Sequence, residues 1–131
     1  MNDVGGPQDE PWADHLETHI STVFLAGDYA YVADEESDFK VIDVSDPTAP
    51  LIVGSCYAGD MLSDVAVAGG HAFATDFYSG LRVLDVSEPT APHQVGALSL
   101  SLTDCIAVDG NYAYVTNWNC GLYVVDVSNI G

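Results

Sequence analysis

Basic residues are almost absent from this sequence. Lys40 and Arg82 are the only two, against 20 acidic residues, so the formal net charge at pH 7 is −18. A surface with this charge repels phosphate backbones and anionic lipids, so we expect no nucleic-acid partner and no membrane-surface partner. Self-repulsion also destabilises a compact chain at low ionic strength. The charge therefore favours high salt, divalent cations or an extracellular or cell-surface setting, with solubility alone as the simpler explanation.

Long apolar runs are missing as well. No stretch approaches the roughly 20 consecutive apolar residues that a membrane-spanning helix needs. The N-terminal sequence Met-Asn-Asp-Val-Gly-Gly-Pro lacks the basic segment followed by an apolar one that is typical of a secretion signal. We therefore expect no membrane insertion. If the protein is exported, we expect a leader that has been removed or is encoded elsewhere.

Cysteine is scarce, and catalytic motifs are lacking. The three cysteines include no Cys-x-x-Cys pair, so zinc or redox spacing is absent. Cys105 and Cys120 are expected at the same end of two paired strands, within reach of a disulfide that export would favour. Cys56 then stays alone or links two chains. The sequence has no Gly-x-Ser-x-Gly elbow and no phosphate-binding loop ending in lysine, so we expect a protein that is not an enzyme.

What the sequence does contain is one segment written nearly three times. Residues 80–92 read Gly-Leu-Arg-Val-Leu-Asp-Val-Ser-Glu-Pro-Thr-Ala-Pro, and similar segments span 40–50 and 121–128. The aspartates that these segments share recur at intervals of 42 and then 41 residues. A fixed period of this size indicates an array of structural repeats.

Each repeat alternates as strands do rather than as helices do. Residues 23–33 read as two strands joined at Gly27-Asp28, and the second strand alternates aromatic with small side chains. The third strand is apolar on both faces and ends in an Asp-x-Ser-x-Pro turn, whose side chains can accept backbone hydrogen bonds. A fourth strand follows at 51–55. The pattern predicts a four-stranded antiparallel meander, which is the size of a propeller blade.

The chain therefore divides into an arm and a repeat region. The arm, residues 1–18, is acidic and rich in turn-forming residues. The repeat region, residues 19–131, holds blades at about 22–63, 64–104 and 105–131. We predict an all-β fold built from three four-stranded antiparallel propeller blades, a partial β-propeller that self-association completes.

The repeated motif resembles that of the LVIVD repeat family. It reads Val-Ile-Asp-Val-Ser at 41–45, Val-Leu-Asp-Val-Ser at 83–87 and Val-Val-Asp-Val-Ser at 124–128. Tyr-Val-Thr-Asn at 114–117 resembles the related YVTN repeats of archaeal surface-layer proteins. The resemblance covers about residues 20–131. It implies a β-propeller of secreted or cell-surface proteins of bacteria and archaea, usually without an assigned catalytic role.

Three repeats are fewer than the about 4 to 8 blades with which propellers usually close, which predicts self-association. Blade three is expected to lack its fourth strand, so Val124 and Asp126 lie on an open edge that another strand can pair with. The repeat register places residues 9–18 at that strand position, with Trp12 and Leu16 as apolar anchors. Donation between copies would build a closed six-bladed ring or an open filament. The alternatives are a fragment of a longer propeller and an arm without fixed structure.

The loops at one end of the blades carry candidate ligand-binding residues. In a propeller, loops between second and third strands share an end with the connections between blades. There, Phe77, Tyr78 and Trp118 could stack on sugar rings, with packing against the adjacent blade as the alternative. Carbohydrate is therefore a possible partner.

An acidic loop at the same end is the candidate metal site. Asp34, Glu36 and Asp38 alternate so that several of their oxygens could face Ca²⁺, which takes six to eight oxygen ligands. The glycine of an EF-hand loop is missing, and a solvated loop is the alternative. We expect no other cofactor.

Overall fold

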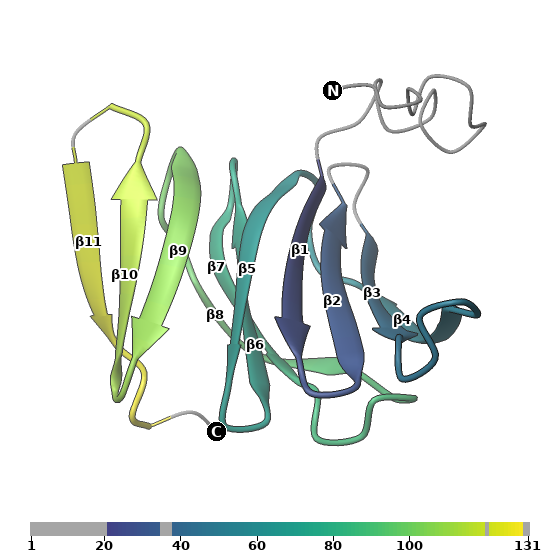
Figure 1. Cartoon of the computed structure of the whole chain (residues 1–131). Coiled ribbons are helices and arrows are strands. Elements are labelled where there is room, and N and C mark those ends of the chain that lie inside the picture. Colours follow the sequence, from purple (N-terminus) through teal and green to yellow (C-terminus); the bar gives the residue numbers. More distant parts are fainter. Residues whose placement is uncertain (1–20, 35–37, 120, 130–131) are drawn as a thin grey trace, which may run out of the picture.

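The computed structural model describes residues 21–34, 38–119 and 121–129, and this part of the chain is built from strands and turns (Figure 1). It contains eleven strands in three antiparallel sheets, two with four strands and one with three. In these residues no helix is long and apolar enough to cross a membrane. The predicted all-β fold is confirmed, while the arm at 1–18 lies outside the described residues.

The three sheets follow one another along the chain, and we call them blades one, two and three. Within each blade, consecutive strands pair in chain order. The second and third blades begin two residues before the predicted boundaries at 64 and 105. Blade one comprises β1 (Ser21–Ala26), β2 (Tyr29–Asp34), β3 (Asp38–Asp43) and β4 (Leu51–Tyr57); blade two comprises β5 (Leu62–Ala68), β6 (His71–Asp76), β7 (Gly80–Asp85) and β8 (His93–Leu98); blade three comprises β9 (Thr103–Asp109), β10 (Tyr112–Asn117) and β11 (Gly121–Asp126).

The same hydrogen bonds close the third strand of every blade. Asp85 Oδ1 accepts one bond from the backbone N–H of Ser87 at 2.9 Å and another from the Ser87 hydroxyl at 2.6 Å. The hydroxyl bond, followed by the backbone bond, lowers the pKa of each of the three aspartates at this position. The predicted turn is therefore confirmed in blades one and two, and the same bonds between aspartate and serine form in blade three. The other two pairs are Asp43 with Ser45 and Asp126 with Ser128.

Neighbouring blades pack large side chains against small ones. We call the face of each blade that carries the larger residues of its second strand the large face, and the opposite face the small face. The large face of blade one and the small face of blade two form one buried cluster, which contains Tyr31, Phe39, Val41, Ala72 and Ala74. Burying a side chain such as phenylalanine or valine stabilises the fold by about 1.5–3 kcal/mol.

Blades two and three repeat this packing one repeat later. Phe73 occupies the position that Tyr31 holds in blade one, and it is 2% exposed. It faces the small side chain of Ala113, which is fully buried in the same cluster. The alternation of large and small residues predicted from the sequence is therefore confirmed at both interfaces.

The first strands of the blades lie side by side at the inner edge, with β5 between β1 and β9 (Figure 1). The Thr22 hydroxyl donates to the backbone oxygen of Ser63 in the next blade at 2.9 Å. The Ser63 hydroxyl lies 3.2 Å from the backbone oxygen of Thr103 in the blade after that. Hydroxyls near the start of the first strands thus link successive blades.

The outer strands β4 and β8 each carry a glycine opposite a register shift in the ladder. A Cβ atom added to Gly54 would collide with the backbone oxygen of Pro89 and lie 2.9 Å from Cδ of Pro92, both in the outer turn of blade two. A Cβ added to Gly96 would meet only Val83 atoms at 3.7 and 3.9 Å, which is ordinary contact. Blade two thus covers the outer strand of blade one, whereas a groove of about 320 Å³ lies beside Gly96.

We expect Gly54→Ala to lower the free energy of unfolding by about 1–3 kcal/mol, because the backbone of the Pro89 turn has to move. Gly96→Ala is the matched control, and it should be neutral or stabilise by up to about 1 kcal/mol, since alanine restricts the unfolded chain. Urea unfolding of both variants measures the difference. Equal effects at the two positions would contradict the packing described here.

Candidate functional site

The loops between second and third strands lie at the same end of the blades as the connections between blades, and we call this the loop end. The N–H of Phe77 donates to the backbone oxygen of Met61 at 2.9 Å, and the N–H of Trp118 donates to that of Leu102 at 2.8 Å. Leu102 also donates its N–H to the oxygen of Phe77 at 2.9 Å. The predicted arrangement of loops and connections is therefore confirmed for blades two and three.

Asp76, which is fully buried, ties these loops together in blade two. Its Oδ1 accepts from the N–H groups of Tyr78 at 2.9 Å and Ser79 at 3.2 Å. Its Oδ2 accepts from the N–H of Asp60 at 2.6 Å, in the connection between blades. Burial raises the pKa of Asp76, but hydrogen bonds from Tyr78, Asp60 and Ser79 outweigh it and hold the pKa below its usual range. The carboxylate therefore stays charged and has a structural role.

Asn117 holds the same position in blade three with a different pattern of partners. Its Oδ1 accepts from the N–H of Asn119 at 2.8 Å, as Asp76 accepts from its own loop. Its Nδ2 donates to the backbone oxygen of Ser101, in the connection between blades. A carboxylate is thus found where the connection presents an N–H, and an amide where it presents a carbonyl. We did not predict this role, although Asp or Asn recurs at the start of each of these loops.

The three predicted aromatic residues come together across blades two and three. The Phe77 ring lies 5.3 Å from that of Tyr78 and 6.2 Å from that of Trp118, in edge-to-face contacts at 85° and 82°. Tyr78 is 66% exposed and Trp118 is 70% exposed. Phe77 thus packs between the blades, while its two neighbours present ring surface to solvent.

A shallow depression of about 460 Å³ opens beside Tyr78. Ser79, Ser99 and Ser101 line it together with Leu100. Hydroxyl groups next to exposed aromatic rings provide both the hydrogen bonds and the apolar surface that a sugar ring uses. Sequence reasoning named the rings but not the serines. Ser79 lies in the loop between β6 and β7, and Ser99 and Ser101 lie in the connection between β8 and β9.

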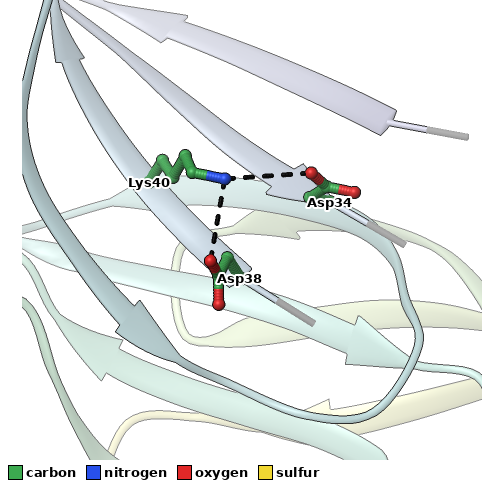
Figure 2. A network of polar contacts seen from close by, with 3 residues as sticks. All are labelled: Asp34, Asp38 and Lys40. Atoms are coloured by element: carbon green, nitrogen blue, oxygen red, sulfur yellow. Dashed lines mark ion pairs between the residues drawn. The ribbon is translucent and has the colours of Figure 1, made fainter. Parts of the chain in front are cut away.

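Two aspartates of the acidic segment in blade one lie beside a lysine. Figure 2 shows the Lys40 ammonium between two carboxylates, 3.9 Å from Asp34 Oδ2 and 3.7 Å from Asp38 Oδ2. Arg82 holds the same repeat position in blade two, and its guanidinium donates to the Ser79 hydroxyl at 2.8 Å. Both basic residues of the chain thus contact side chains at the loop end.

The predicted calcium site includes Glu36, which lies outside the described residues, so this site stays a prediction. Within the ranges that the structure describes, no three His, Cys, Asp or Glu residues are grouped so that they could hold a metal ion.

The described thiols are poor nucleophiles at neutral pH. Burial, and then the charge of Asp38, raise the pKa of Cys56. Burial, with Asp104 next in importance, raises the pKa of Cys105 on β9. A thiol with a raised pKa carries little of the reactive thiolate form. Cys120 lies outside the described residues, so the predicted disulfide between Cys105 and Cys120 stays a prediction.

The residues predicted for self-association fall into two groups. Val124, 57% exposed, and Asp126, also exposed, lie on β11 as expected. Trp12 and Leu16 lie outside the described residues.

Three repeated antiparallel sheets, packed face to face and closed by the same turn, define a propeller-like β-repeat protein. The LVIVD repeat pattern matches three consecutive segments of the chain, residues 19–58, 59–99 and 103–130. These segments coincide with the three blades, and the chain belongs to the LVIVD repeat family. A search of curated proteins found none that matches the chain.

We expect Asp76→Asn to destabilise the fold by about 1.5–3 kcal/mol at pH 7, because an amide places an NH₂ group against a backbone N–H whichever way it is turned. The pKa of folded Asp76 lies below the unfolded value of about 3.9. Its contribution is therefore complete at pH 7 and is lost as the pH falls below about 4. Denaturant unfolding measures the free energy of unfolding of the unsubstituted protein and of the variant. The difference between the two should be smaller near pH 3 than at pH 7.

Asp85→Asn is the control for this experiment. Asp85 uses only Oδ1, in an exposed turn, so an amide oxygen can replace it and the loss should be smaller. A loss as large as that of Asp76→Asn would show that the buried carboxylate has no special role.

Proposed function

We propose that this chain is a non-catalytic structural subunit that self-associates outside the cell or at its surface by adding a strand to blade three. The observation that carries the proposal is the free edge of β11. In blades one and two the third strand pairs with a fourth, β3 with β4 and β7 with β8. Among the described residues, β11 pairs with β10 alone.

The hydrogen-bonding groups on this edge point toward an incoming strand. Val127 donates its N–H to the backbone oxygen of Asn111 at 2.8 Å, which sets the alternation along β11. In an antiparallel ladder, every second residue directs its N–H and C=O to the same side. Leu122 and Val124 therefore direct these groups away from β10. Such a row is a template for another strand.

Charge and chemistry support the rest of the proposal. Copies that each carry a net charge of −18 repel one another, and only a medium with ample salt screens that repulsion. Such a medium fits a secreted or cell-surface protein. The raised pKa values of Cys56 and Cys105 and the structural role of Asp76 support a non-catalytic role. We assign the donated strand to residues 9–18, which lie outside the described residues.

We expect the double substitution Trp12→Ala with Leu16→Ala to weaken self-association, because it removes the apolar anchors of the donated strand. Size-exclusion chromatography with light scattering measures the mass, and hydrogen exchange measures protection of the Leu122 and Val124 amides. Both amides should be protected in the assembled protein and exchange rapidly in the variant. Glu10→Gln is the control, since it keeps both anchors. An assembled protein whose Leu122 and Val124 amides stay unprotected would rule out strand addition at this edge.

A second candidate function is binding of neutral carbohydrate at the loop end. The exposed rings of Tyr78 and Trp118 flank the Phe77 contact, and serine hydroxyls line the adjacent depression. The strong negative charge would repel acidic polysaccharides, so a neutral sugar fits better.

We expect Trp118→Ala to weaken the retardation of the protein in native gels that contain a neutral polysaccharide, tested with dextran, mannan and β-glucan. Removing the ring should cost about 1 kcal/mol or more of binding, because aromatic faces supply the apolar contact. Tyr57→Ala is the control, since this tyrosine is 61% exposed and its ring is not one of the two that contact the Phe77 ring. Equal migration of the unsubstituted protein with and without each polysaccharide would exclude this function for these sugars.

A further inference from the structure

The large face of blade three is exposed at positions that are buried in the other two blades. Phe39 is 0% exposed and Leu81 is 2% exposed, whereas Leu122 at the same repeat position is 59% exposed. Val124 is 57% exposed, and its counterparts in blades one and two are buried. Since the next blade covers these positions in blades one and two, the large face of blade three is an uncovered packing surface among the described residues.

The small face of blade one is exposed in the same way. Val65 and Ile106 are 3% and 8% exposed, because the large face of the preceding blade covers them. Val23, which holds this position in blade one, is 56% exposed. Leu25 is 70% exposed, while its counterpart Val67 packs against the cluster between blades one and two. The described part of the chain thus has an uncovered small face on blade one and an uncovered large face on blade three.

We propose that the two uncovered faces cover each other in a pair of copies, large face against small face, and close a six-bladed ring. This proposal rests on the proposed self-association and names the surfaces that meet. The contact would repeat the packing that both internal interfaces already use, with Val124 and Leu122 of one copy against Val23 and Leu25 of the other. Of whole numbers of copies, only two give a count within the about 4 to 8 blades at which propellers close.

Connectivity agrees with this arrangement. In the chain, an outer strand leads directly into the inner strand of the next blade, as β4 leads into β5 and β8 into β9. In the ring, β1 of the second copy is the inner strand that follows blade three of the first. The donated strand proposed above, residues 9–18, would then occupy the position of the fourth strand of blade three, which β11 leaves open in the described part of the chain. Face packing and strand donation are therefore two parts of one contact.

The test uses one substitution on each face, Val124→Lys and Leu25→Lys, in the full chain. Both side chains are more than half exposed, so the fold should persist, which the unfolding midpoint checks. Lysine lowers the net negative charge, so weaker association cannot come from added repulsion. Light scattering in about 1 M NaCl, where the Debye length is about 3 Å, should give the mass of two chains for the unsubstituted protein. Each variant alters both contacts of a pair, and its dissociation constant should rise about 100-fold or more.

Leu51→Lys is the control. Leu51 is 63% exposed on the outer strand β4, and its counterpart His93 in blade two is exposed too. We therefore expect no neighbouring blade to cover Leu51 in the ring. This variant should associate as the unsubstituted protein does.

Mixing the two variants gives the decisive result. In a head-to-tail pair, the intact large face of the Leu25→Lys chain meets the intact small face of the Val124→Lys chain, so one of the two contacts is restored. The mixture should therefore form mixed pairs at concentrations at which each variant alone is monomeric. A face that meets its own kind would give no rescue, and this result would overturn the proposal.

The remaining outcomes separate this inference from the proposed function. A monomeric unsubstituted protein would overturn both. Assembly that both lysine variants leave unchanged, but that the Trp12 and Leu16 variant weakens, would overturn only the face contact. Masses well above two chains would overturn the closed ring.

Discussion

Packing of one sheet's large side chains against the next sheet's small ones is the interaction on which this structure depends. Each blade alone is a thin sheet with two apolar faces, and it becomes stable only when neighbours remove those faces from water. Tyr31 and Phe73 show how the rule works, because each fills the space that alanine leaves on the following blade. The same rule has a consequence at the two ends of the array, where a face of each kind remains uncovered.

Polar contacts decide how the blades are spaced and joined. The Thr22 and Ser63 hydroxyls reach backbone oxygens of the next blade along the inner edge. At the loop end, Asp76 and Asn117 bind the connection between blades with donor and acceptor groups matched to the backbone that faces them. Because an unmatched buried polar group costs free energy, such pairs fix one arrangement of loops. That fixed frame holds Phe77 between its two exposed aromatic neighbours.

The two proposed roles use different parts of the molecule. Assembly uses the β11 edge and the end faces, whereas carbohydrate would bind at the loop end, beside Tyr78 and Trp118. A ring of two copies would carry two such aromatic sites, so assembly and sugar binding could reinforce each other through multivalency. The net charge of −18 on each chain opposes assembly and favours solubility, so the ionic strength of the medium would set the balance between monomer and ring.

The sequence by itself determined the features that depend on residues close together in the chain. Asp85 and Ser87 are two residues apart, so the turn that they close could be predicted, as could the strands and their alternating faces. Only the tertiary structure decided which side chains meet across the blades. Phe77 and Trp118 lie in different repeats, yet their rings are in contact. Asp76 accepts a hydrogen bond from the N–H of Asp60, which lies in the connection between blades, and no local sequence pattern predicts this contact. The physical reason is that a repeat period fixes equivalent positions, whereas burial and partners depend on whether a neighbouring blade covers them, as the contrast between buried Val41 and exposed Val124 shows.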